Sequence, residues 1–252
     1  MIGFNKLDQL KQQLNSFRPL HQEIVNNLHE DIVLRWTYNS NAIEGNTFTL
    51  KETKVALEGI TIGGKTMIEH FEVINHREAI YFVEKLVEKK EPLSEWDIKS
   101  IHQLVLKNID DKNAGTYRSI NVTITGASHV PSDFLQVQSE MNEFIRWYMN
   151  KGRQMHPVER AARVHADFVK IHPFVDGNGR TSRLLMNLEL MKDGFPPVVL
   201  PVEKRLDYYN ALDAAHTKGD YSDFLILITD IVEKGFEPYW HALGSVKKKS
   251  LI

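Results

Sequence analysis

Apolar residues recur every three or four positions along most of the chain, which is the spacing of an amphipathic helix. Near residues 19–44 this spacing is followed by Ile24, Leu28, Ile32 and Trp36. The same spacing predicts further helices at about residues 67–89, 133–150, 157–171, 180–193, 203–217 and 222–240. We therefore predict a mainly α-helical protein.

Residues that commonly begin or end a helix stand at several of the expected boundaries. Thr49 and Glu52 have the spacing of a capping box, in which each side chain bonds the backbone N–H of the other residue. Ser94 is expected to open a helix whose apolar face includes positions 98, 101 and 105. Gly194 is followed by two prolines and is expected to stop a helix.

One stretch departs from the helical pattern. Residues 121–125 read NVTIT, which alternates polar and apolar side chains and is rich in β-branched residues, as strands are. Gly115, Gly126 and Pro131 flank or interrupt it. We predict a β-hairpin or extended flap over residues 114–131.

Composition narrows the class of protein. Of the 252 residues, 42% are hydrophobic and 25% are charged, which is ordinary for a globular protein. There is no cysteine, so disulfides, thiolate nucleophiles and cysteine metal sites are excluded. A net charge of −2 offers no broad basic surface for nucleic acid. No apolar run approaches the about 20 residues of a membrane span, so we expect a cytoplasmic protein with no membrane partner.

The chain shows no internal repeat and no linker-like stretch, so one compact unit is expected. Within it we distinguish an N-terminal helical region (1–110), a core (111–240) and a C-terminal tail (241–252). The run Lys247–Lys249 is expected to be a solvated part of the tail.

The densest chemistry lies in residues 172–183, which read HPFVDGNGRTSR. A helix is expected to end near His172, because Pro173 disfavours helical geometry at the residue before it. Another helix is expected to open near Arg180. The intervening Asp-Gly-Asn-Gly tolerates left-handed backbone, and N–H groups beside a helix N-terminus form a concave anion site.

The side chains around this loop suit a polyphosphate. Arg180 and Arg183 are three apart and share one helix face. Asp176 could hold Mg²⁺ against the phosphates, and His172 could take a proton from a hydroxyl near neutral pH. Each feature alone has a plainer reading, as a turn, a surface cation or a capping histidine. Together, within twelve residues, they favour a phosphate-processing site.

Residues 172–183 match the Fic motif at every position. The sequences GTYR at 115–118 and HVP at 129–131, with the alternating stretch between them, resemble the flap of that family. Further similarity at 181–197 and 208–209 extends the resemblance over about residues 35–240. The chain thus resembles Fic-domain protein adenylyltransferases, which move AMP from ATP onto a protein hydroxyl. The implied fold is a Fic-type helical domain with a β-hairpin flap and a glycine-rich anion-binding loop between two helices.

The resemblance also implies roles for the motif residues. His172 would be the general base for a Tyr, Thr or Ser hydroxyl, and Asp176 would hold Mg²⁺ between the α- and β-phosphates. Arg180 would contact the phosphates and Arg183 the γ-phosphate. The implied anion hole consists of Gly177, Asn178 and Gly179.

Further nucleotide contacts are implied outside the motif, at Ile124, Thr125, Gly126, Ala127, Tyr208, Tyr209 and His216. His216 stands where related enzymes can carry Asn. The segment 124–127 is longer than in some relatives. The implied partners are ATP and a hydroxyl-bearing protein substrate, and a homo-oligomer is left open.

A second motif lies at residues 40–46, which read SNAIEGN. Glu44 is expected in the last turn of a helix, where the helix dipole disfavours an acid by about 0.3–1 kcal/mol. It is either a solvated acid or the partner of a cation. Ser40, Glu44 and Gly45 resemble the Fic inhibitory motif, in which this Glu pairs with the second motif arginine, here Arg183. Autoinhibition within one chain is implied, and some relatives use the same Glu to remove AMP.

Two alternatives remain beside an autoinhibited AMP transferase. One is a Fic-fold transferase that uses another nucleotide or phosphate-containing donor. The other is a non-catalytic interaction module that kept the scaffold. The presence of His172, Asp176, Asn178 and both motif arginines argues against such a module, since a scaffold has no physical need for all five.

Overall fold

A computed structural model describes residues 3–244. Within them the regular structure is entirely helical. The α-helices are α1 (Asn5–Asn15), α2 (Gln22–Ile43), α3 (Leu50–Leu57), α4 (Met67–Lys89), α5 (Glu95–Leu106), α6 (Val137–Asn150), α7 (Pro157–Ile171), α8 (Asn178–Lys192), α9 (Arg205–Lys218), α10 (Ser222–Lys234) and α11 (Glu237–Ala242). Short 3₁₀ turns occupy Phe134–Gln136, Gly152–Gln154 and Val202–Lys204. The prediction of a mainly helical protein is confirmed.

One helix prediction needs adjustment, and one helix was missed. The helix expected at 222–240 is divided into α10 and α11, and α1 was not predicted. The capping box of Thr49 and Glu52 is present at the start of α3. The run Lys247–Lys249 lies outside the described residues. No helix within residues 3–244 is long and apolar enough to cross a bilayer.

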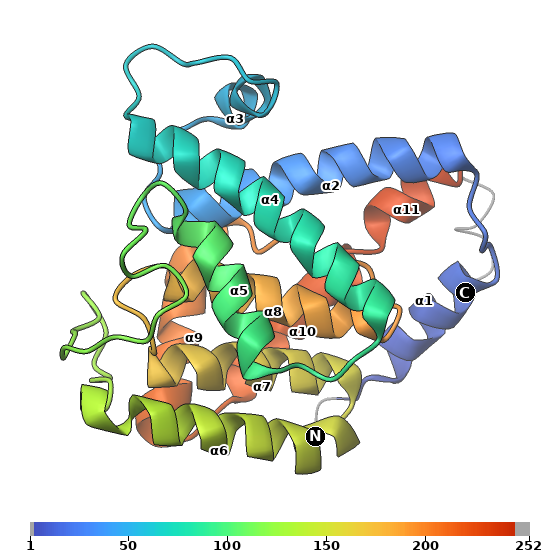
Figure 1. Cartoon of the computed structure of the whole chain (residues 1–252). Helices are drawn as coiled ribbons and strands as arrows, with labels where there is room; N and C mark the ends of the chain where they lie inside the picture. Colours follow the sequence, from blue (N-terminus) through green and yellow to red (C-terminus); the bar gives the residue numbers. More distant parts are fainter. Residues whose placement is uncertain (1–2, 245–252) are drawn as a thin grey trace.

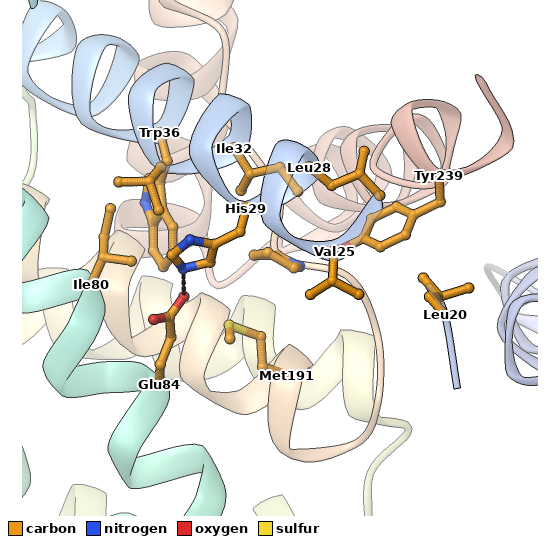
Figure 2. A pocket seen from close by; sticks show the side chains of 12 residues that line it. Leu20, Val25, Leu28, His29, Ile32, Trp36, Ile80, Glu84, Met191 and Tyr239 are labelled. Atoms are coloured by element: carbon orange, nitrogen blue, oxygen red, sulfur yellow. Dashed lines mark hydrogen bonds and ion pairs between the residues drawn. The ribbon is translucent and has the colours of Figure 1, made fainter. Parts of the chain in front are cut away.

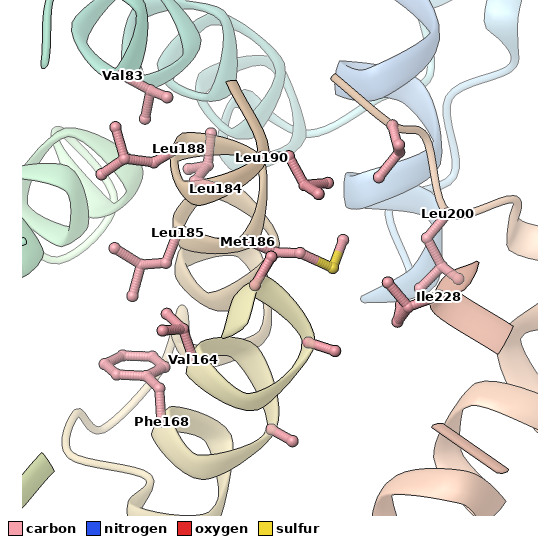
Figure 3. Close-up of a cluster of buried hydrophobic side chains, with 14 of the residues drawn as sticks. Val83, Val164, Phe168, Leu184, Leu185, Met186, Leu188, Leu190, Leu200 and Ile228 are labelled. Carbon is pink, nitrogen blue, oxygen red and sulfur yellow. The ribbon is translucent and has the colours of Figure 1, made fainter. Parts of the chain in front are cut away.

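Helices α7 and α8 pack together at the centre, with α6 on one side and α4, α5 and α2 on the other (Figure 1). Nearly every residue of α8 from Asn178 to Leu190 is buried. Figure 3 shows Val164 and Phe168 of α7 close to Leu184 and Leu185 of α8. These four side chains are fully shielded, and each buried side chain of this size contributes about 1.5–3 kcal/mol. The packing fixes both ends of the loop that joins α7 to α8.

The prediction of a β-hairpin at residues 114–131 is wrong, because this segment carries no strand. Its tip is a turn in which Ala127 N–H donates to the Ile124 carbonyl at 3.1 Å. Gly126, the third residue of this turn, has φ +82°, whereas Thr125 does not have positive φ. Such a turn does not match the twist of paired strands, which require positive φ at the second position. The segment is an extended flap, the other form considered from its sequence.

The two halves of helix α2 differ in how closely they pack against the rest of the protein. Its first half covers an apolar cavity of about 150 Å³, lined by Val25, Leu28 and Ile32 among others (Figure 2). His29 Nε2 and Glu84 Oε1 of α4 form a hydrogen bond at 2.7 Å beside this cavity. The second half of α2 is better packed, and its buried residues include Thr37, Ser40, Asn41 and Ile43. The position of the C-terminal end of α2 is therefore set by its contacts with α4 and α8.

Candidate functional site

The conformation of the loop between α7 and α8 is fixed by two residues with positive φ and by the side chain of Asn178. His172 caps α7 in the left-handed region, with φ +52°, and Gly177 precedes α8 with φ +76°. The side-chain amide of Asn178 accepts from Phe174 N–H at 3.0 Å and donates to the Phe174 carbonyl at 2.9 Å. Asn178 therefore shapes the loop through its side chain. Its backbone N–H lies at the first position of α8, has no intrahelical acceptor and is available to an anion.

The carboxylate of Glu44 occupies the mouth of this loop. Glu44 follows the last residue of α2 and reaches across to the start of α8. A Cβ added to Gly179 would clash with Glu44 Oε1, so the absence of a side chain at Gly179 lets the carboxylate approach the backbone. An anion thus lies where the sequence predicted an anion site, at a helix N-terminus.

Arg183 forms a buried ion pair with the Glu44 carboxylate. One Nη atom donates to Glu44 Oε1 at 2.7 Å and to the Ser40 carbonyl at 2.8 Å, and its Nε donates to Ser40 Oγ at 3.0 Å. The Arg183 side chain is only 3% exposed, whereas Glu44 is 32% exposed. Burial acts against the Arg183 charge, but the Glu44 carboxylate raises the pKa of Arg183 above its ordinary value. The predicted pairing of Glu44 with Arg183 is therefore present in the structure.

Arg180 points to a different pair of acids. It donates to Glu72 of α4 at 2.9 Å and to Asp176 at 3.0 Å. Glu72 also accepts from the Asn46 amide at 2.8 Å. Glu72 thus links the first motif arginine to the loop that follows Glu44.

Asp176 is the exposed carboxylate of the loop, with 64% of its side chain accessible. Apart from Arg180, it accepts from Gly177 N–H at 2.6 Å. No cluster of three or more metal-ligating side chains is found in residues 3–244. A single carboxylate nevertheless fits Mg²⁺, which is commonly bound by one or two carboxylates together with substrate phosphates and waters.

His172, at the start of the loop, carries a neutral imidazole ring. Its Nδ1 lies 3.4 Å from the Val169 carbonyl, which accepts a hydrogen bond, so Nε2 keeps its lone pair. Burial, with the nearby Arg118 charge, lowers the pKa of His172 to about 4. The ring is therefore unprotonated at neutral pH and able to accept a proton.

The flap is attached to this site by a few contacts. Arg118 N–H donates to the Pro173 carbonyl at 2.9 Å, and Arg118 Nε donates to the His172 carbonyl at 2.9 Å. Asp213 of α9 accepts from the backbone N–H groups of Ser128 and His129 at 2.8 and 3.0 Å. The predicted nucleotide-contact segment 124–127 lies at the exposed tip between these anchors.

The three remaining predicted contacts have partners of their own. Tyr208 is buried, and its hydroxyl lies 3.5 Å from Arg183 and 3.2 Å from His165. Tyr209 is partly exposed and donates to the Ile43 carbonyl at the end of α2. His216 is buried and donates from Nε2 to the Ala166 carbonyl at 2.9 Å, which gives its ring a structural role here.

Sequence reasoning missed two residues of the site, Glu72 and His102. His102 of α5 stacks on Phe174 and donates to the Asp176 carbonyl at 2.8 Å. Burial lowers the pKa of His102 to about 4. The available signal was its position on the apolar stripe of α5, because a polar residue on a buried face requires a partner. Glu72 carried no comparable signal on the partly polar helix α4.

The comparisons with known proteins agree with this geometry. A model of the Fic/DOC family matches residues 92–190. The chain is 38% identical over 238 residues to Protein adenylyltransferase Fic of Nematostella vectensis, covering 93% of this chain and 55% of that protein. It is 34% identical over 248 residues to the Drosophila melanogaster protein of the same name, covering 97% and 50%. The chain spans about half the length of these curated relatives.

Solved structures give the same result for the fold. Fic-1 (residues 134–508) of C. elegans superposes with a TM-score of 0.86 and 34% identity, covering 95% of this chain and 71% of that chain. A Fic domain containing signaling protein of Bacteroides thetaiotaomicron gives a TM-score of 0.83 with 28% identity, covering 90% and 92%. The chain belongs to the Fic/DOC family.

Proposed function

We propose that this chain is a protein adenylyltransferase that moves AMP from ATP onto a Tyr, Thr or Ser hydroxyl, and that Glu44 inhibits it. The observation that carries the proposal is the Glu44 carboxylate lying against Gly179 and on Arg183, inside the loop where phosphates are expected. The curated relatives are named protein adenylyltransferases, which supports the same reaction.

In this proposal the loop binds the phosphate chain, and His172 handles the proton. The acceptor hydroxyl attacks the α-phosphorus, its proton passes to His172 Nε2, and pyrophosphate leaves. The N–H groups of residues 177–179 and the two arginines hold the phosphate oxygens, and this positioning supplies most of the rate gain in phosphoryl chemistry. Mg²⁺ beside Asp176 would neutralise charge on the phosphates.

Inhibition follows from the contacts of Arg183. While Arg183 donates to Glu44 and Ser40, it is not available to the γ-phosphate. A nucleotide would then sit without one of its two guanidinium contacts, and misplacement of the reacting phosphate by about 1 Å can cost about 10²-fold in rate. The resemblance to the family's inhibitory motif also implies that Glu44 supports removal of AMP from a modified target, and the proposal includes this second activity.

The experiment is to incubate the Glu44→Gly protein with Mg²⁺ and ATP, or with other nucleotides, and to measure the adduct by intact mass spectrometry. His172→Ala in the same background is the control for non-enzymatic labelling. We expect AMP on the protein itself. A different adduct would favour the Fic-fold transferase with another donor, and the absence of any adduct would favour the non-catalytic module.

A further inference from the structure

His102 lies outside residues 172–183, yet it contacts that loop at three places. Its ring is fully buried and stacks on Phe174, with centroids 3.5 Å apart and planes 1° from parallel. Its Nε2 lies 2.8 Å from the Asp176 carbonyl oxygen. A Cβ on Gly177 would lie only 3.2 Å from the same Nε2, so the ring lies directly beneath the loop.

The hydrogen bonds of His102 determine which ring nitrogen carries the proton. The backbone N–H of Gly115, at the base of the flap, donates to Nδ1 at 2.9 Å. Nδ1 is therefore the acceptor, and Nε2 carries the hydrogen that it donates to the Asp176 carbonyl. One tautomer of one ring thus joins the flap to the anion-binding loop.

The bond to Asp176 also determines the direction of the next N–H group. In a trans peptide the C=O and N–H point in opposite directions. Because the Asp176 carbonyl is turned toward His102, the Gly177 N–H points to the side opposite the His102 ring. There it donates to an anionic oxygen, that of the Asp176 carboxylate, at 2.6 Å.

Nothing in Gly177 itself would keep this peptide in one orientation. Gly177 has φ +76°, and glycine adopts positive and negative φ with similar ease. The peptide between residues 176 and 177 can therefore turn over at little steric cost unless a neighbour holds it. His102 is the side chain that bonds its carbonyl.

We propose that His102 is a positioning residue for nucleotide binding, which holds the peptide between residues 176 and 177 so that Gly177 N–H faces the phosphate chain. The inference rests on the proposed function, because it requires the loop to bind a nucleotide. His102 does not touch the nucleotide and acts through the peptide alone. Because the Gly115 N–H of the flap donates to His102 Nδ1, the tautomer of His102 depends on the position of the flap.

The test compares three variants in the Glu44→Gly background by titration calorimetry with Mg²⁺ and ATP. His102→Phe keeps the ring on Phe174 and removes both hydrogen bonds, whereas His102→Gln keeps an N–H donor within reach of Asp176. Val105→Ala is the packing control, since the Val105 side chain also lies under Gly177 and has no polar atom. The melting temperature of each variant is measured in parallel.

We expect His102→Phe to weaken ATP binding about tenfold, the effect of one well-directed hydrogen bond to a charged group. His102→Gln should restore most of the affinity at a similar melting temperature. Val105→Ala should lower the melting temperature and leave the ATP Kd unchanged. Equal affinities for the Phe variant and its Glu44→Gly parent, or for the Phe and Gln variants, would overturn the role of His102.

A second measurement uses the wild-type chain and needs no mutation. Long-range ¹H–¹⁵N NMR spectra of the imidazoles report the tautomer of His102, and we expect the proton on Nε2. A proton on Nδ1 would overturn the proposal, whether or not the Phe variant folds. If the Glu44→Gly parent bound no ATP and formed no adduct, the proposed function would fail, and the NMR result would still decide how His102 is bonded.

Discussion

Two helix ends in this chain have the same local structure. Helix α2 ends at Glu44 followed by Gly45, and α3 ends at Glu58 followed by Gly59. The glutamates have φ and ψ of −84° and −2° in one case and −80° and 0° in the other. Both glycines have positive φ, +101° and +87°. Nothing in the local backbone separates the two.

Their surroundings are different. Glu44 reaches the buried Arg183 at 2.7 Å and lies against the start of α8. Glu58 is exposed and has no ion pair among residues 3–244. A glutamate at a helix C-terminus is mildly unfavourable in both places, but only Glu44 has a buried cation to offset this. The comparison teaches that the inhibitory role we propose for Glu44 depends on its tertiary contacts, and Glu58 supplies a matched control within the chain.

The largest effect is expected from removing the proposed general base, His172. In the Glu44→Gly background, His172→Ala should lower AMP transfer by about 10²–10⁴-fold, because the proton acceptor is lost. ATP binding should persist, since the loop N–H groups and arginines are unchanged. Labelling with [α-³²P]ATP and binding by calorimetry measure the two quantities. Undiminished transfer would exclude His172 as the base.

The next effect tests the comparison directly. Glu44→Gly should raise self-modification by about 10²-fold, the scale of a restored phosphate alignment. Glu58→Gly makes the same substitution in the same local structure and should leave the rate unchanged. Labelling of both proteins and the wild type with ATP and Mg²⁺ measures the rates. If both substitutions raised the rate alike, the gain would come from helix-end flexibility, not from release of Arg183.

A smaller effect is expected at the exposed carboxylate of the loop. Asp176→Ala in the Glu44→Gly background should lower transfer about tenfold, because a charge-assisted contact to the proposed metal site is removed. It should also weaken the dependence of the rate on Mg²⁺ concentration. Rate measurements over a Mg²⁺ series check both points, and a rate that is unchanged in chelator would remove the metal role.

The smallest expected effect is on how stability depends on pH, and it comes from the buried histidines of the site. Burial lowers the pKa values of His172 and His102 to about 4, and lowers those of His76 and His165 well below the ordinary value. Between about pH 6.5 and 4 the unfolded chain therefore binds more protons than the folded chain, so stability falls as the pH falls. His172→Asn should reduce this slope by up to about 1.4 kcal/mol per pH unit. Urea unfolding at several pH values measures it, and an unchanged slope would contradict the lowered pKa of His172.

The sequence predicted the helices and the loop for physical reasons that are local. Amphipathic spacing identified α4 and α7 with their observed bounds, and the Thr49 capping box marked the start of α3. Helix α1 was overlooked, although Leu7, Leu10 and Leu14 have helical spacing, because Phe4 at its start gives no side-chain cap. The composition of residues 172–183 was enough to predict an anion site.

What could not be predicted depends on contacts between distant residues. The stretch 121–125 has strand-like alternation, but a strand requires a partner, and the turn at Gly126 does not bring one alongside. His102 acts through Asp176, which lies 74 positions away. Local physics also does not separate Glu44 from Glu58, because their local sequences are alike. The pairing of Glu44 with Arg183 was predicted only from the resemblance of residues 40–46 to the family's inhibitory motif.

The central claim, that Glu44 inhibits by holding Arg183, is tested most directly by one pair of proteins. Transfer of label from [α-³²P]ATP is compared between Glu44→Gly and the double variant Glu44→Gly with Arg183→Ala, with His172→Ala as the silent control. We predict that the gain produced by Glu44→Gly is lost in the double variant, because the released arginine is its cause. A gain that persists without Arg183 would contradict the account.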